Sequence, residues 1–133
     1  MEEIILSMQA VSTEGAPKAI GPYSQAVIWN DLVFLSGQVA IDPSTGNIEA
    51  DSTEAQTAQV MKNLQAVLKA SGSDLNKVLR CTVFLTNLED FQAFNLVYGS
   101  FFTSTPPARS TVQVSKLPKG AKVEIDAIAY KSH

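Results

Sequence analysis

Histidine and cysteine, the residues that most often serve as bases, nucleophiles or metal ligands, are almost absent from this sequence. The one histidine is the last residue, His133, and the one cysteine is Cys81. A terminal side chain is usually solvated, which argues against a histidine-based triad or metal site. A single cysteine excludes an internal disulfide, and its apolar neighbours in the sequence favour a reduced core thiol over a catalytic one.

Clusters of basic residues and long apolar stretches are also missing. The chain has 10 Lys and Arg against 13 Asp and Glu, and the basic residues are scattered singly. Since phosphate binding relies on clustered cations, nucleic acid is not expected as the main partner. No stretch reaches the roughly 18–20 apolar residues of a membrane span, so no membrane partner is expected. The first ten residues hold two acids and no arginine, unlike a secretory or mitochondrial leader, so we expect a cytoplasmic protein.

What remains is the composition of an ordinary folded protein. Hydrophobic residues make up 45% of the 133 residues and charged residues 17%. A chain of this length buries a substantial core without disulfides, and no repeat or linker divides it. We therefore expect a single domain over residues 1–133, with residues 1–8 peripheral or disordered.

Strands and turns dominate the beginning of the sequence. Residues 7–12 predict a strand, and residues 26–38 predict a β-hairpin because Asn30 and Asp31 separate two apolar runs and suit a tight turn. The segment "DPSTGN" at 42–47 is a further turn signal.

A helix is predicted from about residue 51 to residue 72. Asp51 with Glu54 resembles a capping box, and Gly72 supplies the helix end. The expected apolar face recurs at helical spacing and consists of Ala58, Met61, Leu64 and Leu68.

The second half of the sequence predicts a buried strand at 78–86, a helix at 88–102, and strands at 109–117 and 121–130. The last two strands are joined by Pro118-Lys119-Gly120 and look like a hairpin. The helix places its aromatic residues along one stripe, which favours core packing over a ligand box: Phe91, Phe94, Tyr98, Phe101 and Phe102.

This order of elements predicts an α+β fold, with two helices packed on one face of a mixed sheet of about six strands. Alternation in the last strands separates an apolar face, with Val112 and Ile125, from a more polar face with Arg109, Thr111 and Glu124. The second face also carries apolar groups and lacks helices to cover it. We therefore expect a homo-oligomer.

Four polar positions stand out where the backbone is unusual or burial is expected. Tyr23 follows Gly-Pro and is equally well a core tyrosine or a site residue. Ser36 and Gly37 end a strand, where a simple bulge is favoured over close approach of a ligand. Asn95 lies on the aromatic stripe, and a buried amide there favours pinning a nearby loop.

Arg109 and Glu124 form the remaining pair of interest. On the two strands of a hairpin they could pair with each other. Alternatively, Arg109 could bind a substrate carboxylate while Glu124 handles water or a proton. The residues alone leave both interpretations open.

Five segments together resemble the RidA family, also called YjgF/YER057c/UK114. They are "GPYSQA", "LSGQ", "TVFLTNLEDFQAFNLVYGSFF", "PPARSTVQV" and "LPKGAKVEIDAIA", and they follow the family's order and spacing from Ala16 to Tyr130. The resemblance implies a chorismate-mutase-like fold and a homotrimer, in which three sheets line a central barrel and ligand sites lie at the subunit interfaces.

The resemblance also implies an activity. It is cofactor-free hydrolysis of 2-imino acids and their enamine tautomers, such as 2-iminobutanoate and 2-iminopropanoate, to 2-keto acids and ammonia, which protects pyridoxal-phosphate enzymes. Two alternatives on the same scaffold are an RNA-directed endoribonuclease or translation inhibitor, and a non-catalytic small-acid-binding or chaperone-like protein.

By the same resemblance, Arg109 is expected to bind the substrate carboxylate, Glu124 to activate water, and Tyr23 to order that water or close the pocket. The residues expected to shape the site are Ser36, Gly37 and Asn95. Many members carry cysteine where this chain has Thr111, so no thiol chemistry is expected there. Thr111 is still expected to contact substrate, through its backbone carbonyl.

Overall fold

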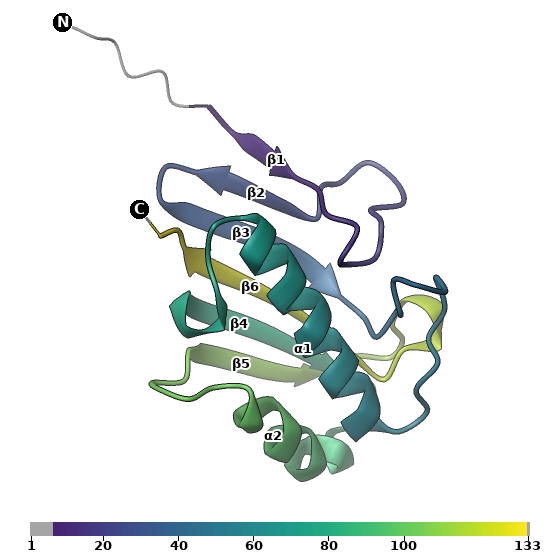
Figure 1. The fold of residues 1–133 in the computed structure, drawn as a ribbon. Helices are drawn as coiled ribbons and strands as arrows, with labels where there is room; N and C mark the ends of the chain where they lie inside the picture. Colours follow the sequence, from purple (N-terminus) through teal and green to yellow (C-terminus); the bar gives the residue numbers. More distant parts are fainter. Residues whose placement is uncertain (1–6, 133) are drawn as a thin grey trace, which may run out of the picture.

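One mixed sheet organises the computed structural model, which describes residues 7–132 (Figure 1). Its strands lie in the order β1-β2-β3-β6-β4-β5, and only β4 and β5 are parallel. The strands are β1 (Gln9–Val11), β2 (Ala26–Trp29), β3 (Leu32–Gln38), β4 (Val78–Leu85), β5 (Ala108–Gln113) and β6 (Val123–Tyr130). The predicted hairpin is confirmed, with Asn30 in the left-handed region at a φ of 54°. The prediction for residues 1–8 falls mostly outside the described residues.

Helix α1 (Thr53–Ala70) covers the middle of the sheet. It begins at Ser52, whose Oγ accepts a hydrogen bond from the Ala55 amide at 3.0 Å. The predicted capping box on Asp51 is therefore wrong, because the serine one residue later occupies the capping position. Gly72, at a φ of +79°, ends the helix as predicted. The fully buried apolar residues of α1 are Val60, Met61, Leu64, Val67 and Leu68; Ala58 is only half-buried.

The predicted second helix is divided in two. A short 3-10 helix, η2 (Leu88–Asp90), leads into α2 (Phe91–Ser100), and Phe101 and Phe102 lie beyond its end. Phe94 and Tyr98 are buried against the sheet, in agreement with a packing role for the aromatic stripe. Helix α2 connects β4 to its parallel neighbour β5, a crossover that a short turn cannot make.

The predicted hairpin between the last two strands is wrong, because β4 lies between β5 and β6. Strand β5 pairs with β4 after the α2 crossover, and the chain then passes the end of β4 through η3 (Pro118–Gly120). Pro118 and Gly120 suit this connection as well as they suit a hairpin turn. The local sequence therefore does not distinguish a hairpin from a connection that passes the end of β4.

The pairing registers place Arg109 and Glu124 on opposite faces of the sheet. Cys81 pairs with Arg109 and with Ala127 on the face that the helices cover, whereas Phe84 pairs with Val112 and Glu124 on the other face. The prediction that Arg109 shares the polar face with Glu124 is therefore wrong. Strand β5 is an edge strand, so its helix-side residues lie at the margin of the helix layer, where a polar side chain is tolerated.

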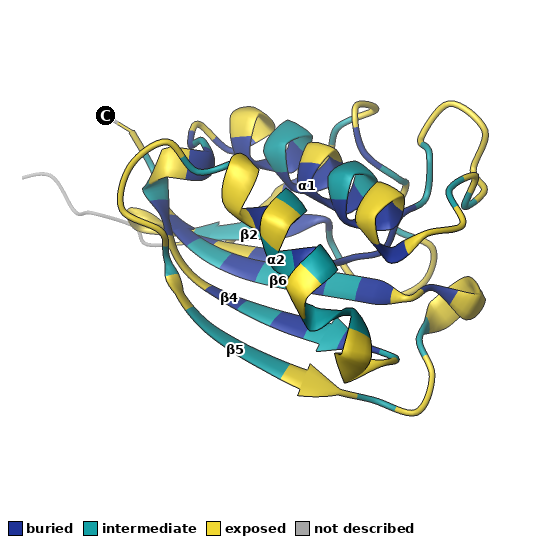
Figure 2. Cartoon of the chain, turned by 90° about the horizontal axis from the view of Figure 1, so that it is seen from below, coloured by how far each residue is buried: buried dark blue, intermediate teal, exposed yellow. Residues whose placement is uncertain are grey.

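No described element covers the second face of the sheet (Figure 2). Large apolar side chains remain exposed on it: Trp29, Leu32, Phe34, Val112 and Tyr130. Within residues 7–132, no helix is both long and apolar enough to cross a membrane.

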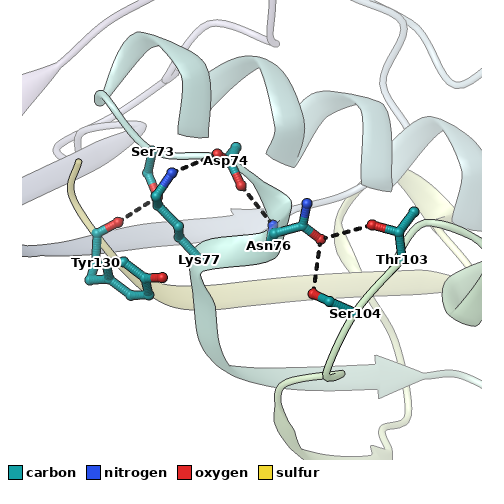
Figure 3. A network of polar contacts seen from close by, with 7 residues as sticks. All are labelled: Ser73, Asp74, Asn76, Lys77, Thr103, Ser104 and Tyr130. Carbon is teal, nitrogen blue, oxygen red and sulfur yellow. Dashed lines mark hydrogen bonds and ion pairs between the residues drawn. The ribbon is translucent and has the colours of Figure 1, made fainter.

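A polar network fixes the connection that leads into β5 (Figure 3). The Asn76 Oδ1 accepts hydrogen bonds from the hydroxyls of Thr103 and Ser104, at 3.3 and 3.4 Å. Asn76 is itself held through its amide by Asp74, which also forms an ion pair with Lys77 at 2.9 Å. The segment between α2 and Arg109 is thereby tied to the turn that precedes β4.

Candidate active site

Arg109 lies on the helix side of β5 among three aromatic rings. Its Cζ is 5.5 Å from the ring centroid of Phe91, 5.6 Å from that of Phe94 and 4.9 Å from that of Tyr98. We call these three rings the aromatic cage. A guanidinium over aromatic faces is held by cation–π attraction, which strengthens as the group is desolvated. Arg109 is half-buried, so the cage fixes a charge that solvent only partly screens.

Among the described residues, no carboxylate lies within ion-pair distance of Arg109. The guanidinium instead borders a cavity of about 470 Å³, which is lined by Leu88, Phe91, Arg109 and Thr111. A guanidinium held by its faces keeps its N–H edge available for a planar anion such as a carboxylate. This cavity with the aromatic cage is called the arginine half-site below.

Two buried oxygens have no hydrogen-bond partner among the described residues: Asn95 Oδ1 on α2, and the hydroxyl of Thr111, which lines the cavity. The Tyr98 hydroxyl interacts with Cys81 and Arg109. Buried polar atoms are rarely left unpaired, and each such loss costs about 1–3 kcal/mol. The loop-pinning role predicted for Asn95 is not made through its Oδ1, which accepts no hydrogen bond from the described residues. The unpaired Thr111 hydroxyl lines the same cavity as Arg109, so both groups offer hydrogen bonds to a polar group there.

The neighbours of Arg109 stay uncharged near neutral pH. Burial raises the pKa of Tyr98, and the nearby Cys81 adds to this effect. Burial also raises the pKa of Cys81, which is 2% exposed and belongs to the hydrophobic core, as predicted. A thiol with a raised pKa is a poor nucleophile, so Arg109 is the charged group of this half-site.

Glu124 lies on the other face of the sheet, against Gly37. The register between β3 and β6 shifts between Leu35 and Gln38, so the predicted bulge is present. A Cβ atom placed on Gly37 would lie 2.6 Å from Glu124 Oε2 and 2.9 Å from Glu124 Cδ. Glycine is therefore required for the carboxylate to occupy this position.

The environment of Glu124 favours its protonated form. Burial raises the pKa of Glu124, and the like charge of Asp126 on the same face of β6 raises it further. The carboxylate borders a second cavity of about 260 Å³, whose lining includes Tyr23, Gly37 and Lys119. We call this cavity with Glu124 the glutamate half-site. A carboxylate with a raised pKa is a stronger base than an ordinary glutamate.

Tyr23 is exposed rather than part of the core, with 53% of its surface accessible. Its hydroxyl accepts a hydrogen bond from the Ile20 amide at 3.4 Å, which leaves the O–H free to donate. The Ser36 hydroxyl donates to the carbonyl oxygen of Ser24 at 2.6 Å and so ties β3 to the loop that carries Tyr23. The Tyr23 side chain thus lines the cavity of the glutamate half-site. Ser36 does not line this cavity but holds the loop that carries Tyr23.

Gln25 is a residue of this region that sequence reasoning missed. Gln25 is buried, and its side-chain amide makes two hydrogen bonds with the backbone of Thr13. Its Oε1 accepts from the Thr13 N–H at 2.7 Å, and its Nε2 donates to the Thr13 carbonyl oxygen at 3.0 Å. It also donates to the carbonyl oxygen of Pro17 at 2.7 Å, and Pro17 lines the glutamate half-site. The sequence signal that could have identified Gln25 is its place as a long polar residue directly before the apolar strand β2.

The structure thus divides the predicted site residues between two half-sites with no lining residue in common. Arg109 and Thr111 belong to one, with Asn95 on the adjoining helix; Tyr23, Gly37 and Glu124 belong to the other, with Ser36 behind them. Across residues 7–132, no three His, Cys, Asp or Glu side chains come together as metal ligands. The fold defines a two-layer α+β protein in which the Arg109 guanidinium and the Glu124 carboxylate lie on opposite faces of one sheet.

Comparison with known proteins gives this class a family. Residues 13–131 match the family model described as Endoribonuclease L-PSP. The human 2-iminobutanoate/2-iminopropanoate deaminase is 42% identical over 124 residues, which cover 93% of this chain and 90% of that protein. The chain belongs to the Endoribonuclease L-PSP family, and the resemblance to RidA proteins seen in the sequence is confirmed.

Solved structures agree with this assignment. A protein of unknown function of the conserved Rid family, YyfA from Yersinia pestis, is 46% identical with a TM-score of 0.91, covering 93% of this chain and 99% of that one. The structure of E. coli TdcF with bound serine is 43% identical with a TM-score of 0.89, again covering 93% and 99%. The predicted fold class, two helices on a mixed six-stranded sheet, is confirmed.

Proposed function

We propose that this protein hydrolyses 2-imino acids and their enamine tautomers to 2-keto acids and ammonia. The observation that carries the proposal is Arg109, a half-buried cation held by three rings beside a cavity, with no carboxylate of the described chain to neutralise it. A substrate carboxylate supplies the missing anion, and two parallel hydrogen bonds then fix its plane. The name of the human relative and the serine bound to TdcF, itself a carboxylate, agree with this proposal.

The reaction needs one water and one group that moves a proton. Water attacks C2 of the protonated imine, and the C=N π electrons move to nitrogen as the C–O bond forms. Glu124 takes the proton that the water loses and returns it to the amine nitrogen of the tetrahedral intermediate. As the C–N bond then breaks, the hydroxyl oxygen of the intermediate forms the C=O bond and loses its proton to Glu124. Glu124 passes this proton to the departing ammonia, so the 2-keto acid and ammonium leave and the carboxylate is regenerated. A protonated imine is already electrophilic, so positioning supplies most of the acceleration.

Arg109 and Glu124 act together only if a second copy of the chain completes each site. The two residues lie on opposite faces of the sheet, and the open face carries a broad apolar surface that water would otherwise contact. Exposed patches of this kind mark association surfaces, and closed rings bury them fully. In the proposed homotrimer, the open faces line a central barrel and each interface joins an arginine half-site to a glutamate half-site.

The remaining site residues have supporting roles in this proposal. Tyr23 donates a hydrogen bond from its hydroxyl to the attacking water and so orders it, and Gly37 leaves the space that the Glu124 carboxylate needs. Thr111 presents its backbone beside the substrate, and Asn95 offers its unpaired Oδ1 to a polar group of the ligand. Ser36 holds the Tyr23 loop in place through Ser24.

A trapping assay tests the proposal directly. 2-Iminobutanoate is generated in situ and captured by semicarbazide, and wild-type protein is expected to lower the semicarbazone yield by consuming the imine. Arg109→Ala is expected to reduce this effect at least about 100-fold, because two charge-assisted hydrogen bonds to the substrate are lost. Equal yields with and without wild-type protein would overturn the proposed activity.

The family's description leaves RNA cleavage as the competing activity. The chain has three more acidic than basic residues, and among residues 7–132 Arg109 is the only cation that lines the cavity of the arginine half-site. An electrostatic footprint for RNA is therefore weak. RNA degradation that persists through repeated purification and is lost in Arg109→Ala would favour that activity over imine hydrolysis.

A further inference from the structure

We infer that Phe91 determines specificity at this site, and that it selects 2-imino acids with aliphatic side chains longer than a methyl group. The inference rests on the proposed function, because it treats the arginine half-site as the place where the substrate carboxylate binds. It goes beyond that function by assigning the substrate's side chain to a defined wall of the cavity.

Phe91 is the one ring of the aromatic cage that also borders the cavity. Its ring lies 5.5 Å from the Arg109 Cζ, and with Leu88 it forms the apolar part of the lining. Arg109 and Thr111 supply the polar part. A carboxylate bound to Arg109 therefore has an aromatic ring and a leucine side chain next to it, where its own apolar substituent is placed.

This apolar wall is fixed by the sheet. The Leu88 amide donates to Gln113 Oε1 at 2.9 Å, and Gln113 lies on β5 four residues after Arg109. The 3-10 helix that carries Leu88 runs directly into α2, which begins at Phe91. The distance between Arg109 and the apolar wall is thus set by the hydrogen bond from the Leu88 amide to the Gln113 side chain and by one short helical connection.

Phe94 provides a matched comparison on the same helix. It lies 5.6 Å from the Arg109 Cζ, almost the same distance as Phe91, but it is fully buried and does not line the cavity. Both rings hold the guanidinium, and only Phe91 has a surface that a ligand reaches. Substitutions at the two positions therefore separate positioning of Arg109 from contact with the substrate's side chain.

The chemistry of the wall indicates which substrates are favoured. The side chains of Leu88 and Phe91 carry no group that would hydrogen-bond to a hydroxyl or to a charged side chain, and the polar lining residue Arg109 is occupied by the substrate carboxylate. An aliphatic side chain loses water contact against these residues, and each buried methylene improves binding about fourfold. The 2-imino acid derived from leucine is therefore a better substrate than the one derived from alanine.

The test compares these two imines across four proteins. L-Amino acid oxidase generates 2-imino-4-methylpentanoate or 2-iminopropanoate at equal rates, and semicarbazide trapping gives kcat/KM for each. In Phe91→Ala, the ratio of the two kcat/KM values is expected to fall about tenfold towards the smaller imine. Phe91→Leu keeps an apolar wall and restores the ratio to within about twofold of wild type. Phe94→Leu lowers both values together and leaves the ratio unchanged, because it acts through Arg109.

The possible outcomes distinguish this inference from the proposed function. An unchanged ratio in folded Phe91→Ala, with activity still dependent on Arg109, would overturn the specificity role and leave the deaminase intact. A ratio that falls equally in Phe94→Leu would also overturn it, since both rings would then act only by holding Arg109. Absence of imine hydrolysis in the wild-type protein would instead remove the proposed function itself. Circular dichroism and thermal unfolding show that each variant is folded before it is assayed.

Discussion

The two half-sites are built in different ways. The arginine half-site is made of a helix and a strand, with three aromatic rings of α2 near its cation and the unpaired Thr111 hydroxyl in its lining. The glutamate half-site is made of a bulge, a loop and one strand, with an exposed tyrosine at its margin. In the first half-site, packing holds Arg109 in place. The second is more open, and burial together with Asp126 raises the pKa of its carboxylate.

This difference suggests a division of labour between orientation and proton transfer. An anchor must be held still to orient a substrate, and the aromatic cage does this without using a protein carboxylate that would compete with the ligand. A proton-transfer group needs a suitable pKa and access to water, which partial burial beside Asp126 provides. In the proposed homotrimer, an arginine half-site of one copy joins a glutamate half-site of another, and this arrangement meets both requirements.

The largest expected effect tests whether the two half-sites come from different copies. Arg109→Ala and Glu124→Gln are each expected to be nearly inactive. When the two variants are unfolded and refolded together in equal amounts, about a quarter of the interfaces receive both intact residues, so about a quarter of wild-type activity returns. Imine trapping measures it.

If each site lay within one copy, every site in the mixture would still lack one of the two residues and no activity would return. The control is the same mixture combined after separate refolding. That sample remains inactive as long as the copies do not exchange.

The next effect concerns Glu124 alone. Glu124→Gln keeps the size of the side chain and removes proton transfer, so activity is expected to fall about 10²- to 10⁴-fold. In the wild type, activity is expected to decline as the pH falls through the raised pKa of Glu124, above the range of an ordinary glutamate. Rates of imine hydrolysis measured at a series of pH values locate this acid limb of the activity profile. A decline at the pH expected for an ordinary glutamate would contradict the role given to burial.

The same shift predicts an opposite effect on stability. The folded state holds the Glu124 proton more tightly than the unfolded state, so the stabilisation is complete at low pH and is lost as the pH rises through the two pKa values. Above that window, Glu124→Gln is expected to unfold at a higher temperature than wild type, by on the order of 2 °C. Below it, the two proteins should melt together.

The division of the site also explains what the sequence could predict. Alternation and helical spacing identified the strands, both helical segments and the buried Cys81, because each depends on neighbours in the chain. Arg109 and Glu124 were recognised as candidates by residue type and by family resemblance. Their placement on opposite faces depends on the position of β4 between β5 and β6. This strand order is a long-range feature that the turn residues between β5 and β6 do not indicate.

The contact between the aromatic cage and Arg109 is likewise a long-range feature that the local sequence does not predict. The stripe of Phe91, Phe94 and Tyr98 correctly indicated packing against the sheet. The sequence did not indicate that the packed group would be a guanidinium, because that follows from the parallel register that aligns Cys81 with Arg109. Gln25 was missed for a similar reason, since its partners lie on a loop whose course the sequence does not specify.

A smaller effect is expected from Gly37→Ala, which tests how adaptable the glutamate half-site is. The new methyl group meets Glu124 Oε2 and Cδ, and the carboxylate must move away from it. Activity is expected to fall about tenfold, because a displacement of the proton-transfer group lowers the rate, while the free energy of unfolding changes by less than about 1 kcal/mol. Trapping kinetics and urea unfolding give the two numbers.

The matched substitution in the arginine half-site is Phe94→Ala. It removes a fully buried ring and is expected to cost about 3–5 kcal/mol of stability. A Gly37→Ala protein as unstable as Phe94→Ala would show that the glutamate half-site is as rigid as the arginine half-site.

The smallest expected effect is that of Asp126→Asn, which separates the two causes of the raised pKa of Glu124. Burial is the larger cause and remains in the variant, whereas the like charge of Asp126 is removed. The amide oxygen of the new side chain can still accept the hydrogen bond from the Thr82 amide that Asp126 Oδ1 accepts at 3.0 Å, so the β4–β6 pairing is kept. The acid limb of the activity profile is therefore expected to move to lower pH by the smaller part of the shift, with the rate near neutral pH within about twofold of wild type. A limb that moves all the way to the ordinary glutamate value would make Asp126, rather than burial, the main control of the proton-transfer group.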